Sequence, residues 1–268
     1  MEKCNKKLHH ETVAFIKAQG LGNDFVMIDI DGLSEYDWSK FAKQMSNRRL
    51  GIGFDQLLLF KKSKVWFYNS DGTEAETCGN GTRCLAYYLM SKNNCTSIEI
   101  ETPGGTVFCS LNSDRTVSVQ MTKPTVVEER SIVAHADLFK YPPVFVRIGN
   151  PHLVCFVEHL DDIHEYGPIL SRQDVNVEFV NVLNEHQLRL KVWERGAGLT
   201  PACGSGACAS VIAAQHHKLV ESNVEVFQDG GKLDISWNGT ELYMRGACQI
   251  VYEGQLSGQF FSSFCQVE

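Results

Sequence analysis

The 268-residue sequence lacks the features that mark secreted, membrane-spanning and nucleic-acid-binding proteins. Its first eleven residues are polar and contain no apolar core, so we expect no secretory leader. No apolar run approaches the length that crosses a bilayer. Lysine and arginine form pairs such as Lys6-Lys7 rather than patches, and the formal net charge is −7. We therefore expect a cytoplasmic protein that binds neither membranes nor nucleic acid.

Signatures of metal sites are also missing, although the chain has ten cysteines. It contains no C-x-x-C pair. The glycine-rich stretch between Cys203 and Cys208 fits a turn into a helix better than a zinc site. In a reducing compartment most cysteines are free and buried. We expect no bound metal.

A repeated cysteine motif is the most informative feature that is present. Val65–Asn69 is followed by Cys78–Gly81, and Leu190–Glu194 is followed by Cys203–Gly206. Aligned without a gap, the two cysteines are 125 positions apart, and a polar residue, Asn69 or Glu194, stands nine positions before each. This repeat predicts two similar halves around one pocket, with two thiols facing each other across it.

The hydrophobic pattern predicts the architecture of each half. Cys84–Met90 and Ala207–Ala214 are nearly apolar all round, as expected of buried helices that begin at the Cys-Gly-x-Gly motifs. Trp38–Arg49 has helical spacing, and short strands fill most of the rest. We therefore predict an α/β (α+β) fold with two pseudo-symmetric domains, each a curled, mostly antiparallel sheet around a central helix.

Domain boundaries follow from the same pattern. The chain is long enough for two medium domains. Residues 1–123 form the first half, which carries Cys78, and residues 124–252 form the second, which carries Cys203, with the crossing near Pro124. We expect the tail from about residue 253 to pack back on the first half.

Cysteine at a helix N-terminus gives the motif its chemistry. Unpaired N–H groups and the helix dipole lower the pKa of a cysteine there and hold a carboxylate. If two such helix termini face one amino-acid carboxylate, the α-carbon next to that carboxylate lies between two sulfurs. One thiolate then removes the α-proton and the other thiol protonates the opposite face, which inverts an amino acid without a cofactor.

Other conspicuous residues have two readings. Gly20-Leu21-Gly22 looks like part of a nucleotide loop, but no G-x-G-x-x-G leads into a parallel β-α-β unit. His152 is either a hydrogen-bonded structural group or a functional one. Glu194 and Arg195 are either a surface ion pair or, because Glu194 aligns with Asn69, part of the pocket.

Over nearly its whole length the sequence resembles the diaminopimelate epimerase family. The motifs that carry this resemblance are Gly20–Phe25, Gly51–Gln56, Tyr68–Gly72, Cys78–Arg83, Gly149–His152, Val175–Val177, Glu194–Gly198 and Cys203–Cys208. The resemblance implies a homodimeric enzyme that converts LL- to meso-diaminopimelate without pyridoxal phosphate, for lysine and cell-wall synthesis.

The resemblance also implies roles for individual residues. Cys78 and Cys203 are the acid and base, and His152 and Glu194 assist them. Backbone N–H groups of Gly79, Asn80, Gly204 and Ser205 hold the reacting carboxylate. The remaining substrate-binding positions are Asn23, Gln56, Asn69, Asn150, Asn176 and Arg195. Glu178 stands where the resemblance leads us to expect glycine, which would alter the segment carrying Asn176.

Three other functions compete with this hypothesis. A proline or hydroxyproline racemase would not need Arg195 and so many amides, which suit a second, distal amino-acid head. A thiol redox protein would usually use C-x-x-C rather than two distant cysteines. A non-catalytic amino-acid-binding protein would not need both motif cysteines. Loss of an α-deuterium label from the substrate would distinguish an epimerase from the last two.

Overall fold

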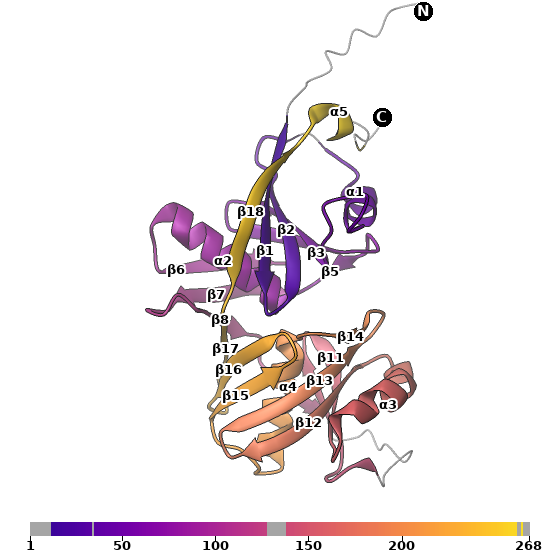
Figure 1. The fold of residues 1–268 in the computed structure, drawn as a ribbon. Coiled ribbons are helices and arrows are strands. Elements are labelled where there is room, and N and C mark those ends of the chain that lie inside the picture. Colours follow the sequence, from indigo (N-terminus) through magenta and orange to yellow (C-terminus); the bar gives the residue numbers. More distant parts are fainter. Residues whose placement is uncertain (1–11, 34, 128–137, 262–263, 265–268) are drawn as a thin grey trace, which may run out of the picture.

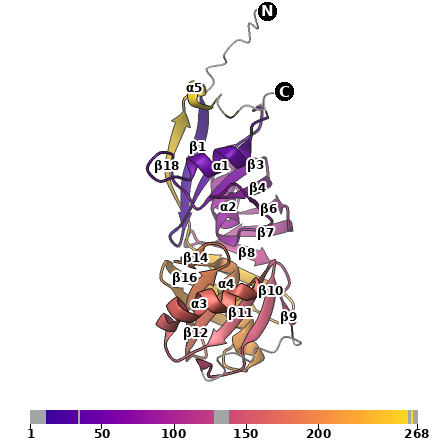
Figure 2. The same cartoon turned by 90° about the vertical axis from the view of Figure 1, so that its right-hand side faces the viewer.

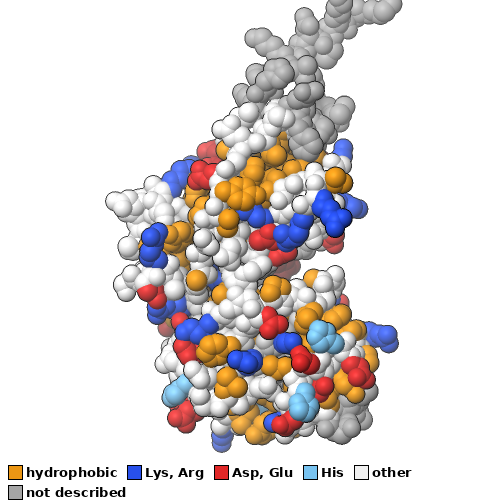
Figure 3. Space-filling view, viewed as in Figure 1, with side chains coloured by type: hydrophobic (Ala, Val, Ile, Leu, Met, Phe, Trp, Pro, Cys, Tyr) orange, Lys and Arg blue, Asp and Glu red, His pale blue; other side chains and the backbone are white. Residues whose placement is uncertain are grey.

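The computed structural model describes residues 12–33, 35–127, 138–261 and 264. The molecule is elongated, with two halves stacked end to end and both ends of the described chain in the upper half (Figure 1, Figure 2). On the face shown in Figure 3, basic and acidic side chains are interspersed. Within the described residues, no helix is long and apolar enough to cross a membrane.

The upper half is a strongly curved sheet that includes the last strand of the chain. Its spatial order is β18-β1-β2-β3-β4-β6-β7-β8, with β5 on the edge of β4. Neighbours are antiparallel except β2–β3 and β4–β6. The strands are β1 (Val13–Gly20), β2 (Asn23–Asp29), β3 (Gln56–Lys61), β4 (Lys64–Asn69), β5 (Glu74–Ala75), β6 (Ser97–Thr102), β7 (Gly105–Leu111), β8 (Val117–Met121) and β18 (Gln249–Leu256).

The lower half repeats this arrangement strand for strand. Its order is β9-β10-β11-β12-β13-β15-β16-β17, with β14 on the edge of β13 and parallel pairs at β11–β12 and β13–β15. The strands are β9 (Thr125–Val127), β10 (Val144–Ile148), β11 (Asn150–Phe156), β12 (Asn176–Asn184), β13 (Gln187–Glu194), β14 (Gly198–Thr200), β15 (Asn223–Gln228), β16 (Gly231–Trp237) and β17 (Leu242–Gly246).

A buried helix runs through the middle of each curled sheet. Helix α2 (Gly79–Asn93) is capped by Cys78, and α4 (Gly204–His216) is capped by Cys203. Each cap sulfur accepts a hydrogen bond from the glycine three residues on, over 3.2 Å at Gly81 and 3.4 Å at Gly206. Side chains of both helices share one large apolar core with the inner faces of the strands. The mixed α/β fold with two pseudo-symmetric halves is confirmed.

Two of the shorter helices differ from what the sequence pattern predicted. Helix α1 (Trp38–Met45) ends before Arg49, because the Asn47 side chain accepts hydrogen bonds from the N–H groups of Arg49 and Leu50 and forms a turn instead. Helix α3 (Ile163–Leu170) follows the short 3₁₀ turn Leu160–Asp162 and precedes another, Ser171–Gln173. The pattern did not predict α3, which contains Gly167 and Pro168.

The two halves are joined by strand pairing and by two crossings of the chain. Strands β8 and β17 pair antiparallel, with Met121 opposite Leu242. The chain passes down after β8 and returns after β17, where β18 pairs with β1 so that Leu256 lies opposite Val13. Beyond β18, helix α5 (Gly258–Phe261) brings the Phe261 ring to 5.4 Å from that of Phe41 on α1.

Candidate active site

The N-termini of α2 and α4 meet at the junction of the two halves. A Cβ atom added to Gly204 would lie 3.2 Å from Oδ1 of Asn80 and 2.7 Å from the sulfur of Met244. One added to Gly79 would lie 3.0 Å from Cε of Met244. Both motif glycines therefore have close neighbours that leave little room for a larger residue, and the starts of the two helices lie against each other.

Burial disfavours the thiolate form of both cap cysteines. Burial raises the pKa of Cys78 to about 12, and the nearby Glu194 carboxylate adds to the rise while the Gly81 N–H opposes it. Burial, followed by Glu194 and Glu178, also raises the pKa of Cys203. The expectation of thiolates favoured by the helix N-termini is therefore wrong here, because the loss of hydration outweighs the N–H groups.

The charge of Glu194 acts on both cysteines, although Glu194 belongs to the second half. It ends β13, as Asn69 ends β4, so the aligned positions are structurally equivalent. Its carboxylate accepts hydrogen bonds from the Thr200 hydroxyl over 2.5 Å and from the Cys203 thiol. Burial raises the pKa of Glu194, and its charge acts on both cysteines. The surface ion-pair reading of Glu194 and Arg195 does not hold, because Glu194 is turned toward the thiols.

The predicted amides of the first half form a partial network. Nε2 of Gln56 donates to Oδ1 of Asn69 over 2.8 Å across the β3–β4 pair. Nδ2 of Asn23 donates to Asp55 over 2.8 Å, and the Asn80 amide approaches Asn23 at 3.5 Å. These four amides thus come from the ends of β2, β3 and β4 and the start of α2.

Arg83 supports Asn80 and was not singled out in the sequence. Its fully buried guanidinium donates from Nη1 to Oδ1 of Asn80 over 3.1 Å and from Nε to the carbonyl of Ala247 over 3.2 Å. Because arginine can only donate, it turns the Asn80 oxygen inward and the NH₂ group outward. Arg83 also fastens α2 to the segment where the chain returns from the second half.

A charged cluster that the sequence did not reveal holds the loop next to Asn23. The Asp24 carboxylate accepts hydrogen bonds from Lys17 over 2.5 Å and from Arg48 over 2.9 and 2.7 Å. Arg48 also binds Asp55 at 2.9 Å. Burial raises the pKa of Asp24, but the hydrogen bonds from Arg48 and Lys17 outweigh it, and the net pKa falls from 3.8 to about 2.

We expect Asp24→Asn to lower the free energy of unfolding by on the order of 2 kcal/mol at pH 7. A lowered folded-state pKa contributes stability that is present above the unfolded value of 3.8 and is lost as the pH falls through about 2. Urea unfolding at pH 7 and pH 2 should therefore show a difference between variant and parent at pH 7 only. Asp114→Asn is the control: its pKa is also lowered to about 2, but it is solvent-exposed, and the loss should be smaller. An equal loss in both variants would contradict this account.

In the second half, His152 and Asn176 lie on neighbouring parallel strands. They are opposite each other in the β11–β12 register. Oδ1 of Asn176 accepts the Arg195 backbone N–H over 2.9 Å. The Arg195 side chain is 49% exposed and binds Asp174 at 2.9 Å. Strand β12 keeps regular pairing from Val177 to Val182, so Glu178 does not distort the segment that carries Asn176.

The remaining predicted residues take different positions. Asn150 is exposed at the start of β11, just after Gly149, and a Cβ on Gly149 would lie 3.1 Å from the hydroxyl of Thr77. The turn before Asn150 therefore touches the residue before Cys78. Ser205 lies 3.5 Å from the Cys203 sulfur, and Gly204 is buried beside Asn80.

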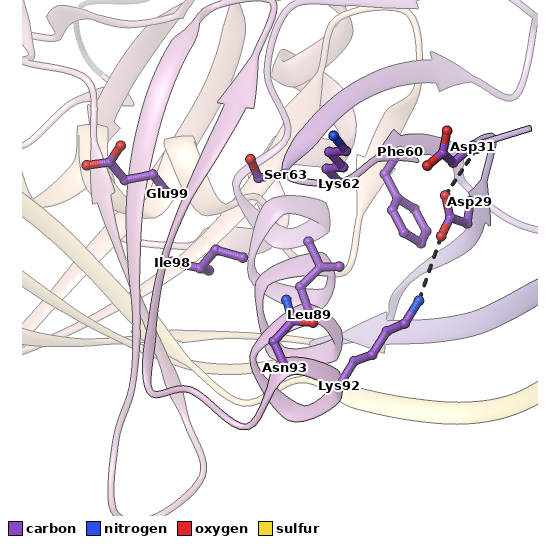
Figure 4. A pocket seen from close by; sticks show the side chains of 10 residues that line it. All are labelled: Asp29, Asp31, Phe60, Lys62, Ser63, Leu89, Lys92, Asn93, Ile98 and Glu99. Atoms are coloured by element: carbon purple, nitrogen blue, oxygen red, sulfur yellow. Dashed lines mark hydrogen bonds and ion pairs between the residues drawn. The ribbon is translucent and has the colours of Figure 1, made fainter.

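A separate surface cavity of about 660 Å³ lies at the other end of α2 and contains none of the predicted site residues. Figure 4 shows Leu89, Lys92 and Asn93 of α2 on its wall, opposite Asp29 and Asp31, with Lys92 3.8 Å from Asp29. Among the described residues, no group of three or more His, Cys, Asp or Glu is arranged to hold a metal ion. The candidate site is therefore the junction of the helices rather than this cavity.

Solved structures of several kinds of protein share this fold. A phenazine biosynthesis protein of the PhzF family from Bacillus anthracis has a TM-score of 0.70 at 17% identity, covering 92% of this chain and 99% of that one. A hydroxyproline epimerase from Agrobacterium vitis has a TM-score of 0.69 at 12% identity, with 93% of each chain covered. At these identities the likeness shows the fold alone.

Sequence relatives are much closer. The family model for diaminopimelate epimerase matches residues 15–127 and 144–251. Diaminopimelate epimerase of Halothermothrix orenii is 35% identical over 91% of this chain and 98% of that protein. The protein of that name from Azotobacter vinelandii is 38% identical over 90% of this chain and 98% of its own length. Since the match runs through both halves and nearly the full length of these relatives, the chain belongs to the diaminopimelate epimerase family.

Proposed function

We propose that this protein interconverts LL- and meso-diaminopimelate, for lysine and cell-wall synthesis, by two-base proton transfer between Cys78 and Cys203 without a cofactor. The observation that supports it best is that two cysteines cap two buried helices whose N-termini meet, and that one carboxylate, Glu194, acts on both thiols.

The reacting carboxylate is held between the two helix N-termini. The first turn of each helix has N–H groups that its own carbonyls cannot satisfy, and Gly79, Asn80, Gly204 and Ser205 lie in the first turns of the two helices that meet at the junction. As the α-proton leaves, charge moves onto the carboxylate oxygens and these fixed donors stabilise it. The α-carbon is then located between the two sulfurs.

The cysteine that acts as base must first lose its own proton. Both thiols have raised pKa values, so each needs an acceptor close by. Glu194 accepts the hydrogen bond of Cys203, and burial raises the pKa of this carboxyl, which makes it a stronger proton acceptor than an exposed glutamate. The S–H bond breaks as the Glu194 O–H bond forms, and the reverse transfer completes the cycle.

Amides and one arginine hold the distal amino-acid head. Asn69, Asn150 and Asn176 can both donate and accept, which suits a zwitterion, and the Arg195 guanidinium suits its carboxylate. The Arg195 guanidinium binds the exposed Asp174, a partner that a substrate carboxylate can replace. This distal site favours diaminopimelate over proline, which has no second head.

The assembly and location are also proposals. We propose a cytoplasmic homodimer, as the family resemblance implies. Val251 and Tyr252 on β18 are about half exposed and offer apolar area for the contact. Light scattering should give twice the chain mass of 30.0 kDa. A mass of one chain would contradict the dimer.

The activity is tested with LL-diaminopimelate that carries deuterium at its α-carbons. The enzyme should release label to water while meso-diaminopimelate appears, with no added cofactor. A thiol redox protein or a binding protein would leave the label in place. Release of label from proline but not from diaminopimelate would favour the racemase alternative.

A further inference from the structure

A buried histidine and glutamate in the second half form a pair, and the family resemblance gives a role to the histidine alone. His152 on β11 and Glu178 on β12 are both 0% exposed. Nδ1 of His152 lies 2.6 Å from Oε1 of Glu178. The other polar atom of each side chain, Nε2 of His152 and Oε2 of Glu178, has no protein partner among the described residues. Buried polar atoms without partners are rare and call for an explanation.

The register of the strands and a missing side chain make the pair possible. In the parallel β11–β12 register, His152 is opposite Asn176, and Glu178 is two residues further along the same face of β12. A Cβ atom on Gly206 would lie 2.7 Å from Oε1 of Glu178. The carboxyl therefore occupies space against the first turn of α4 that only glycine leaves open.

This position suits a negative charge. Glu178 lies beside the N-terminal turn of α4, which is the positive end of the helix dipole. The carboxylate is close enough to Cys203 and Glu194 to act on both, and His152 acts on Glu194. The pair is thus electrostatically part of the candidate site, although neither residue is exposed.

We propose that Glu178 is a positioning residue that accepts the Nδ1–H of His152 and so keeps Nε2 free to accept a proton. An ionised carboxylate can only accept, so the imidazole must present an N–H to it. When Nε2 takes the proton that Glu194 has accepted from Cys203, the Glu194 O–H bond breaks, an N–H bond forms, and Glu178 stabilises the resulting imidazolium. The proton returns by the same path, so no external reagent is consumed.

The proposed effect of Glu178 on catalysis rests on the proposed epimerisation, but the predicted tautomer of His152 does not. ¹⁵N NMR of histidine-labelled, substrate-free protein reports which ring nitrogen carries the proton. The His152 signal is found by comparison with the His152→Gln variant. We expect Nδ1–H with Nε2 unprotonated in the parent. Glu178→Gln, whose amide can donate to Nδ1, should raise the Nε2–H population. An Nε2–H tautomer in the parent, or no change in Glu178→Gln, would overturn the proposal.

Kinetics test whether Glu178 acts through His152. We expect Glu178→Gln to lower kcat by about 10²-fold or more and to change KM by less than about threefold. In a His152→Gln background the same substitution should cost less than about threefold, because the group it positions is gone. Equal losses in both backgrounds would mean that Glu178 acts independently and would refute the positioning role.

Two further variants control for folding. Glu225→Gln on β15 also removes a hydrogen-bonded carboxylate, the partner of Lys232, and should leave kcat unchanged. Glu178→Asp keeps the charge but shortens the side chain, so its kcat should fall between those of the parent and Glu178→Gln. If Glu178→Gln does not fold, both the NMR and the kinetic measurements are made on Glu178→Asp instead. A kcat and a His152 tautomer equal to those of the parent would then count against the proposal.

Discussion

Cys78→Ala and Cys203→Ala are each expected to abolish epimerisation, with kcat lower by about 10⁴-fold. The reason is geometric. Each sulfur lies at its own helix N-terminus, one in each half, so neither can reach the face of the α-carbon that the other serves. Cys208→Ala makes the same replacement in the buried part of α4 and should retain activity. Near-normal turnover in either cap variant would refute the assignment.

Heavy water distinguishes two bases from one in the parent enzyme. The group that protonates the product exchanges with solvent, whereas the group that accepts the substrate proton is a different one. Early product should therefore carry deuterium at the α-carbon while the remaining substrate stays protiated. Substantial early deuterium in unreacted substrate would indicate a single base that returns its proton to the same face, and the two-thiol scheme would then fail.

Arg195→Lys is expected to lower kcat/KM by on the order of 10²-fold or more. A guanidinium binds a carboxylate through two parallel hydrogen bonds, which an ammonium cannot reproduce. Because binding at the distal head aligns the reacting carbon, kcat should fall as well as affinity. Arg189→Lys, at an exposed position on β13, the strand that ends just before Arg195, is the control and should behave like the parent.

The same distal site predicts substrate choice. Lysine lacks the distal carboxylate and should be a very poor substrate for the unmodified enzyme, since Arg195 would remain bound to Asp174. Initial rates with lysine, alanine and diaminopimelate at equal concentration test this. Efficient racemisation of lysine or alanine would show that no distal site exists, and would indicate a broad amino-acid racemase.

Local sequence patterns were sufficient to predict the features that depend on residues close together in the chain. A cysteine followed by small residues and an apolar run predicts a capped, buried helix, and both helices begin within the motifs. The nine-residue spacing to Asn69 and Glu194 predicted equivalent strand ends, since strand, loop and helix form one unit. Helix α3 was missed because Gly167 and Pro168 argue against a helix, whereas in the structure Gly167 allows α3 to pack closely against Trp193 of β13.

Contacts between distant strands could not be read from the sequence. His152 and Glu178 are 26 residues apart and meet only because β11 and β12 are parallel and in a particular register. Glu178 therefore looked like a departure from a pattern rather than a partner for a histidine. The effect of burial on the cysteines was missed for a similar reason, because the loss of hydration depends on what covers each thiol.

The return of β18 to β1 has a consequence for the order of folding during synthesis. Strands β9 to β17 are contiguous in the chain, so the second half can close its sheet as soon as Gly246 has left the ribosome. The first half cannot, because β1 pairs on one side with a strand that ends at Leu256. The half that is made first is therefore completed last, and the outer edge of β1 stays open to wrong partners until β18 has been translated.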